Sequence, residues 1–167
     1  MFVPIEKMPD HSRTWVYLSD RRLTGGELME AEEFLADFCS GWKVHSQSLP
    51  ASYTILENHF VVLVADESGL SVSGCSIDSS VHMLKALQER IKADFFNRNL
   101  VPFEMDGQVV LINRRELQQR LAASQWGEDT TTFNMLSGTL KEIRRNWRVP
   151  ARESWLKTYL CRQTAGS

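Results

Sequence analysis

The sequence places one of its three cysteines where a thiol could react. Cys75 lies in a run of serine and glycine residues, SVSGCS, that directly precedes a stretch with helical periodicity. Free backbone N–H groups and the helix dipole at the start of a helix favour a thiolate or a bound anion. His82 falls on the same side of that helix as Cys75, at about 100° per residue. This spacing makes Cys75 a candidate nucleophile and His82 its candidate base.

A plainer interpretation accounts for the same residues, and we favour it. Gly74 and Cys75 are small, as a tight turn between a strand and a helix requires. His82 is then an ordinary surface side chain, because proximity in the sequence is not the geometry that catalysis demands. Neither the histidines nor the carboxylates follow a metal-ligand spacing such as H-E-x-x-H. We therefore expect no metal ion and no cofactor.

Charged and small residues at the ends of two expected strands form a second candidate site. The candidates for ligand binding are Asp20, Arg21, Asp66, Glu67, Ser73, Gly74 and Ser76. We expect the preceding strands, at 14–19 and 60–65, to be parallel neighbours, so that their carboxyl ends lie together. The predicted site is the rim formed by the Asp20–Arg22 turn and the Gly69–Ser76 loop. Clustered carboxylates can also hold Mg²⁺, but charged residues at strand ends commonly do no more than solvate a turn.

Charge is divided unevenly along the chain. The net charge is −2, yet the segment from Lys141 to Arg162 holds seven basic and two acidic side chains, which leaves −7 for the remainder. Arginines near Trp147 and Trp155 could contact phosphates and stack bases, as in proteins that bind single strands. The isoelectric point of about 6.1 disfavours nucleic acid as the partner. We expect the basic segment to pair with the acidic first helix, within the chain or across a homodimer.

The elements that must position these residues indicate an α+β fold. Strand-like runs lie at 14–19, 51–56, 60–65 and 108–112. They alternate with two helices of apolar periodicity. Thr24 and Glu27 form a capping box at the start of the first helix. The order β-α-β-β-α-β predicts a split βαβ, or ferredoxin-like, antiparallel sheet with helices on one face and a C-terminal strand and helix extension.

We expect a single domain over residues 1–167. Its βαββαβ body covers about 12–114, and its C-terminal extension covers about 115–167. The run FVVLVA at 60–65 is apolar on both faces, which predicts a central strand covered by other elements. In the extension, Pro150 is expected to open a last amphipathic helix, because proline is favoured in the first turn.

The segment from Ser73 to Phe96, SGCSIDSSVHMLKALQERIKADFF, resembles a signature of a family of small, uncharacterised bacterial proteins. The N-terminal PIEKMPDHSRTWVYLSDRRL and the C-terminal VPARESWLKTYL are similar to the corresponding parts of that family, so the resemblance extends over most of the chain. Because no biochemical activity is established for the family, the resemblance implies no catalytic residues. Members of this family are often labelled ABC-transporter ATPases.

The ATPase label fails on the residues of this chain. A P-loop needs G-x-x-x-x-G-K-[ST], in which backbone N–H groups cradle the phosphates and the lysine reaches them. No glycine in this sequence is followed by lysine. The residues LSGT at 136–139 begin like the ABC signature LSGGQ and then depart from it. We therefore reject ATP hydrolysis as the function.

The composition of the chain excludes several further classes of protein. With 167 residues, 43% hydrophobic and 24% charged, the chain can bury a core and is not intrinsically disordered. The longest apolar run is too short to cross a membrane, and the N-terminus lacks a secretory apolar region, so we expect no membrane partner and a cytoplasmic location. We predict a non-catalytic protein that binds a protein partner or a small ligand at the rim. The alternative is a small thiol-dependent or phosphate-handling enzyme that uses Cys75.

Overall fold

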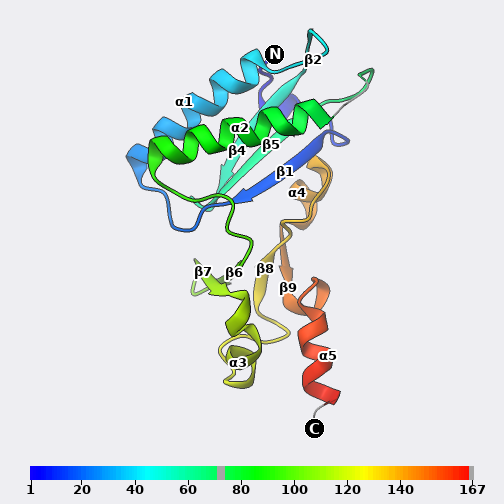
Figure 1. Cartoon of the computed structure of the whole chain (residues 1–167). Coiled ribbons are helices and arrows are strands. Elements are labelled where there is room, and N and C mark those ends of the chain that lie inside the picture. The colour runs from blue at the N-terminus through cyan, green and yellow to red at the C-terminus, as the bar shows by residue number, and fades with distance from the viewer. Residues whose placement is uncertain (71–73, 166–167) are drawn as a thin grey trace. The chain divides into compact units, whose positions relative to one another are not determined.

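The computed structural model describes residues 1–70 and 74–165, and the chain forms two compact units. Unit 1 comprises Met1–Phe96 and Leu136–Arg144, and unit 2 comprises Asn97–Met135 and Arg145–Ser167. Both contain helices and antiparallel strands (Figure 1), so the α+β class is confirmed. The single domain stays a prediction. The two units do not coincide with the expected body and extension, because the chain enters unit 2, returns to unit 1 and ends in unit 2.

Unit 1 is built on a three-stranded sheet in the order β1-β5-β4. Its strands are β1 (Arg13–Leu18), β4 (Ala51–Leu56) and β5 (Phe60–Ala65). β4 and β5 form the predicted hairpin, and Glu57 and Asn58 in its turn both have φ of 54°, the left-handed region that a type I′ turn requires. Every residue of β5 is buried, as the apolar run predicted for a central strand.

The first and third predicted strands pair antiparallel, so the predicted parallel pairing is wrong. Arg13 lies opposite Ala65, and Leu18 lies opposite Phe60. The helical connection from β1 leads to β4, which runs in the same direction as β1. The hairpin then returns β5 between these two strands, so β5 opposes both. The split βαβ order is not confirmed, because the expected last strand of that sheet belongs to unit 2.

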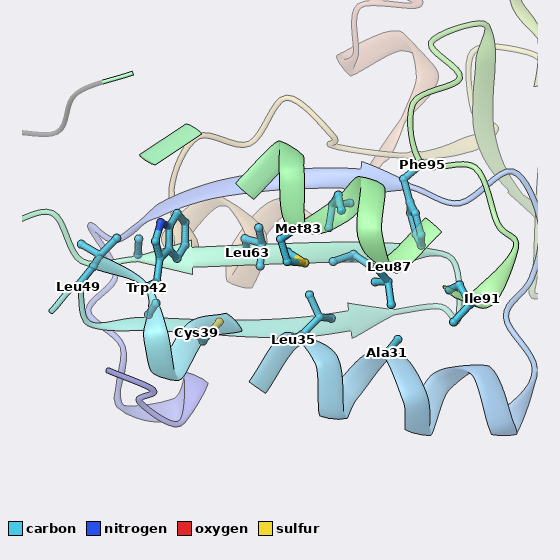
Figure 2. Packing of buried hydrophobic residues seen from close by; sticks show 14 of the residues in the cluster. Ala31, Leu35, Cys39, Trp42, Leu49, Leu63, Met83, Leu87, Ile91 and Phe95 are labelled. Atoms are coloured by element: carbon cyan, nitrogen blue, oxygen red, sulfur yellow. The ribbon is translucent and has the colours of Figure 1, made fainter. Parts of the chain in front are cut away.

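Two helices, α1 (Gly25–Gly41) and α2 (Gly74–Ile91), cover one face of this sheet (Figure 2). The capping box of α1 is confirmed: Thr24 Oγ1 accepts from Glu27 N at 3.3 Å, and Glu27 Oε1 accepts from Thr24 N at 2.9 Å. The apolar stripes of both helices meet alternate residues of β5 in one core. That core includes Ala31, Leu35, Cys39, Val61, Leu63, Met83, Leu84, Leu87 and Ile91.

Shorter elements complete unit 1. They are the 3₁₀ helix η1 (Ile5–Lys7) and the ladder of β2 (Lys43–Val44) with β3 (Gln47–Ser48), which connects α1 to β4. The segment 136–144 returns to the edge of β1, where Thr139 forms an antiparallel bridge with Arg13. It leads into α4 (Leu140–Asn146), from which Arg144 Nη1 donates to Asp10 Oδ1 at 2.6 Å. These contacts cover the start of the β1 edge.

Unit 2 is built on a four-stranded antiparallel sheet in the order β7-β6-β8-β9. Its elements are β6 (Leu100–Met105), β7 (Gln108–Asn113), η2 (Arg114–Glu116), α3 (Leu117–Ala122), β8 (Thr131–Phe133), β9 (Arg148–Pro150), η3 (Ala151–Glu153) and α5 (Lys157–Ala165). The predicted strand at 108–112 is β7, and the helix expected after Pro150 is η3 followed by α5. The core of unit 2 packs around the fully buried Phe103.

Sequence reasoning missed β6, because Pro102 lies within it and proline is disfavoured inside sheets. The β6–β8 ladder covers only Phe103 and Glu104, so Pro102 lies outside that ladder. The dipeptide Asp106-Gly107, with both φ angles positive, forms the turn between β6 and β7. An Asp-Gly pair between apolar runs is the signal that could have identified this hairpin. In the described ranges 1–70 and 74–165, no helix is long and apolar enough to cross a membrane.

Candidate binding surface

The antiparallel register separates the two halves of the predicted rim. Asp20 follows the end of β1 that lies opposite Phe60, whereas Asp66 follows β5 at the end that lies opposite Arg13. Six-residue strands span about 17 Å between such ends. The structure therefore does not bring the Asp20–Arg22 turn together with Asp66 and Glu67.

Asp20 and Arg21 make contacts that hold unit 1 together. Arg21 Nη1 donates to Glu27 Oε1 at 2.8 Å, and Arg21 Nη2 donates to Glu27 Oε2 and, at 2.9 Å, to the carbonyl oxygen of Ile91. Asp20 Oδ1 accepts a hydrogen bond of 3.0 Å from Asp94 N. The hydrogen bond from Arg21 is the main reason why the pKa of Glu27 is lowered to about 2. These contacts connect the start of α1 to the end of α2, which gives both predicted ligand-binding residues a structural role.

At the opposite end of the sheet, Asp66 and Glu67 also bind neighbouring side chains. Asp66 Oδ1 accepts from Ser68 Oγ at 2.6 Å and from Ser68 N at 3.0 Å, and it lies 3.3 Å from His11 Nε2. These bonds lower the pKa of Asp66, and the bond from the Ser68 hydroxyl has the largest effect. Glu67 Oε1 accepts from Arg13 Nη1 at 3.5 Å. Among the described residues, no group of three or more histidine, cysteine, aspartate or glutamate side chains could hold a metal ion.

The predicted nucleophile and base both belong to α2. Gly74 and Cys75 are its first two residues, so the backbone of Cys75 lies in the first turn, as expected. Ser73 and the side chains of Gly74, Cys75 and Ser76 lie outside the described residues. His82 is exposed. Seven helical residues correspond to about 10 Å along the axis, which is much longer than the hydrogen bond between a nucleophile and its base. The pairing of Cys75 with His82 stays a prediction.

The other two cysteines differ sharply in their surroundings. Cys39 is fully buried in the core of unit 1, and burial raises the pKa of its thiol to about 12. Because the thiolate is the reactive form, Cys39 is inert at neutral pH. Cys161 lies exposed on α5.

In unit 2, Arg114 and Arg162 lie over aromatic rings, and they were not among the candidates from the sequence. The guanidinium carbon of Arg114 lies 4.9 Å from the centre of the Trp155 ring, and that of Arg162 lies 5.7 Å from the centre of the Tyr159 ring. The rings of Trp155 and Tyr159 meet edge to face, with centroids 6.1 Å apart. Both rings are half-buried and pack against the core of unit 2. We call these four residues, together with the exposed Arg115 and Lys157 close to them in the sequence, the arginine–aromatic surface.

In the described part of the structure, the cations of this surface have no carboxylate partner. Within the described part of the chain, no ion pair is formed by Arg114, Arg115, Lys157 or Arg162, and all four are exposed. By contrast, Arg120 of the same unit pairs with Glu116 at 3.4 Å. Unit 2 as a whole has nine basic and six acidic side chains, a charge of +3, whereas unit 1 has ten basic and fifteen acidic ones, a charge of −5.

Two arginines of the basic segment have carboxylate partners within unit 2. Arg148 Nε donates to Glu104 Oε2 at 3.0 Å, and Arg152 pairs with Asp129. Neither of these acidic residues belongs to α1. The pairing of the basic segment with the acidic first helix, within the chain or across a homodimer, stays a prediction.

Sequence reasoning missed the arginine–aromatic surface because its parts are far apart along the chain. Trp155 and Tyr159 have the i, i+4 spacing of a helix face that packs against a core, and they do pack against the core of unit 2. Arg114 follows β7 and comes near the ring of Trp155 only through the fold of unit 2. The cluster of two arginines directly after a strand is the signal that could have drawn attention to them.

Unit 2 also carries a hollow of about 320 Å³ lined by Leu121, Ser124, Gln125, Trp126, Gly127 and Thr130. One of these residues, Trp126, is held in place by a hydrogen bond of 2.9 Å from its Nε1 to the carbonyl oxygen of Leu117. The lining has no charged side chain that would orient an ionic ligand. The hollow therefore offers less for recognition than the arginine–aromatic surface.

Comparisons of the chain with family models, curated proteins and solved structures found no match. The resemblance to a family of small bacterial proteins stays a prediction. Function is therefore argued from the chemistry of the surface itself.

Proposed function

We propose that this protein acts by binding an acidic protein partner through the arginine–aromatic surface of unit 2. The observation that carries the proposal is the position of the Arg114 and Arg162 guanidinium groups over two half-buried rings. Arg115 and Lys157, close to them in the sequence, are exposed, and no carboxylate is paired with any of the four cations in the described residues. Each cation keeps its charge available to a partner. The rings add apolar area that loses water on binding.

The residue types favour a protein over a nucleic acid. Arginine, tryptophan and tyrosine are the residues that contribute most to protein–protein interfaces. The two rings are fixed by the core of unit 2, so little side-chain entropy is lost when a partner covers them. A nucleic-acid module is usually strongly basic, whereas unit 2 carries only +3.

The proposal keeps the predicted class, a non-catalytic binding protein of the cytoplasm, and moves the binding site. The rim expected from the sequence required the Asp20–Arg22 turn to lie beside Asp66. The guanidinium of Arg21 and the carboxylate of Asp66 already bind neighbouring groups. The arginine–aromatic surface is free of such internal ion pairs among the described residues.

Binding to poly-L-glutamate tests the proposal. The informative variant is R115E/K157E, because neither side chain stacks on a ring or lies in the core. We expect its affinity for poly-L-glutamate to fall at least about tenfold, a loss of roughly 1.4 kcal/mol. The matched control R98E/R145E makes the same charge change at two exposed arginines of unit 2 outside the surface, and we expect it to bind within about twofold of the unmodified protein.

Two outcomes would overturn the proposal. Equal weakening in the control variant would show that net charge, and not this surface, drives the association. Tighter binding of single-stranded oligothymidylate than of poly-L-glutamate, lost in R115E/K157E, would show that the surface serves a nucleic acid. Circular dichroism of each variant checks that the fold is retained.

A further inference from the structure

The outer face of α1 has the opposite character to the arginine–aromatic surface. Glu32, Glu33 and Asp37 are exposed, and at about 100° per residue they lie on the same side of the helix as Met29. The opposite side of α1 carries Ala31 and its neighbours into the core of unit 1 (Figure 2). We call the residues Met29, Glu32, Glu33 and Asp37 the α1 acidic face.

The carboxylates of this face are not neutralised by the described residues. Glu27 pairs with Arg21 and Glu30 pairs with Arg90, but no ion pair involves Glu32, Glu33 or Asp37 in residues 1–70 and 74–165. The pKa of Tyr53 on the neighbouring strand β4 is raised, mainly by burial and to a smaller extent by the negative charge of Glu32. The α1 acidic face therefore presents uncompensated negative charge.

Met29 gives the face an apolar centre. Its side chain is 73% exposed, which makes it one of the few large apolar residues of the described chain that are mostly in water. A thioether packs favourably against aromatic rings. Three carboxylates on the same side of α1 as an exposed methionine thus match the cations and rings of the arginine–aromatic surface, in both charge and apolar character.

We propose that the acidic partner is a second copy of this chain, with the α1 acidic face of one copy bound to the arginine–aromatic surface of another. This inference rests on the proposed function and names its partner. The charges of the units, −5 and +3, give the same complementarity at longer range. Met29 of one copy would contact the rings of Trp155 and Tyr159 of the other, and the carboxylates would pair with the surrounding cations.

Self-association measured by sedimentation velocity over a concentration series tests this inference. We expect the unmodified protein to associate reversibly and to dissociate when NaCl is raised from about 50 mM to about 500 mM, because exposed ion pairs are screened. The variants E32K/E33K and R115E/K157E should each associate at least about tenfold more weakly. The control E6K/E89K makes the same charge change at exposed positions of unit 1 outside α1 and should associate as the unmodified protein does.

An equimolar mixture of the two reversed variants is the decisive measurement. In each variant alone, the two substituted residues carry charge of the same sign as the surface that they face, and they repel it. In the mixture, the substituted residues of E32K/E33K can pair with those of R115E/K157E, and the two unmodified surfaces can pair with each other. We therefore expect association to return in the mixture. A variant that had only lost its fold would not be rescued in this way. A protein that stays monomeric while still binding poly-L-glutamate through Arg115 and Lys157 would overturn the second copy as partner and leave the proposed function standing. Association without rescue would overturn the assignment of these two surfaces.

Discussion

Replacing Glu27 by glutamine should destabilise unit 1 in a manner that depends on pH. The carboxylate accepts two hydrogen bonds from Arg21, which also donates to the carbonyl oxygens of Ile91, the last residue of α2, and of Lys92. The pKa of Glu27 is about 2 in the folded chain, against an ordinary value of 4.5. At roughly 1.4 kcal/mol per pH unit, this difference of about 2.5 units sets an upper bound of about 3.5 kcal/mol on the stabilisation.

The expected magnitude is smaller than this bound. The side chain of Arg21 is 40% exposed and that of Glu27 is 18% exposed, so water screens part of the interaction. Glutamine can still accept from Thr24 N and preserve part of the capping box. We expect E27Q to lower the free energy of unfolding by about 1 to 2 kcal/mol near neutral pH.

The sign of the pH dependence follows from the lowered pKa. A carboxylate with a lower pKa in the folded state stabilises the fold above its unfolded value, and this stabilisation is lost as the pH falls toward the folded value. The difference between the unmodified protein and E27Q should be constant above about pH 5.5 and should shrink between about pH 5 and pH 2. Urea unfolding of both proteins at a series of pH values measures this difference in the free energy of unfolding.

A variant on the same helix provides the control. Glu30 pairs with Arg90, but these side chains are 39% and 53% exposed, so E30Q should change the free energy of unfolding by no more than about 0.5 kcal/mol. If E27Q cost no more than E30Q, or if its effect were the same at about pH 3 as at pH 7, the argument from the Arg21–Glu27 pair would be refuted. Poly-L-glutamate binding should be unchanged in E27Q, because the pair lies in unit 1.

Two further predictions concern single side chains. Iodoacetamide should modify Cys161 in the folded protein but Cys39 only after unfolding, because Cys39 is buried and the pKa of its thiol is raised to about 12. Peptide mass mapping of the labelled protein checks this prediction. Labelling of Cys39 in the folded protein at neutral pH would contradict it. Trp126→Phe removes the hydrogen bond from Nε1 to the carbonyl oxygen of Leu117 and should lower the free energy of unfolding by about 1 kcal/mol in urea titrations, whereas an unchanged stability would show that this buried bond contributes little.

Local features of unit 1 were predictable because they depend on residues close together in the chain. The capping box at Thr24 involves backbone and side-chain groups three residues apart, and its residue types determine it. The hairpin of β4 and β5 needs only two apolar runs and a short connection, and the run FVVLVA can be buried only in the middle of a sheet. The β6–β7 hairpin has an equally local signal in Asp106-Gly107, which Pro102 obscured.

The direction of pairing between β1 and β5 could not be predicted in the same way. A βαββ order is compatible with more than one sheet order, and the choice depends on how helices and strands pack over long sequence separations. The antiparallel register rules out the predicted rim as one site, because it places Asp20 and Asp66 at opposite ends of the strand pair. The roles of Arg21 and Asp66 as internal partners followed from that register.

The sequence by itself determined the α+β class, the helix start at Thr24, the buried central strand and the separation of negative from positive charge. These features arise from periodicity, capping and composition, which act locally or as sums along the chain. Only the tertiary structure decided which sheet each strand joins, and only it placed Arg114 over the ring of Trp155. The reason is physical: a contact between residues distant in the chain forms only when the packing of the whole unit offsets the entropy lost in bringing them together.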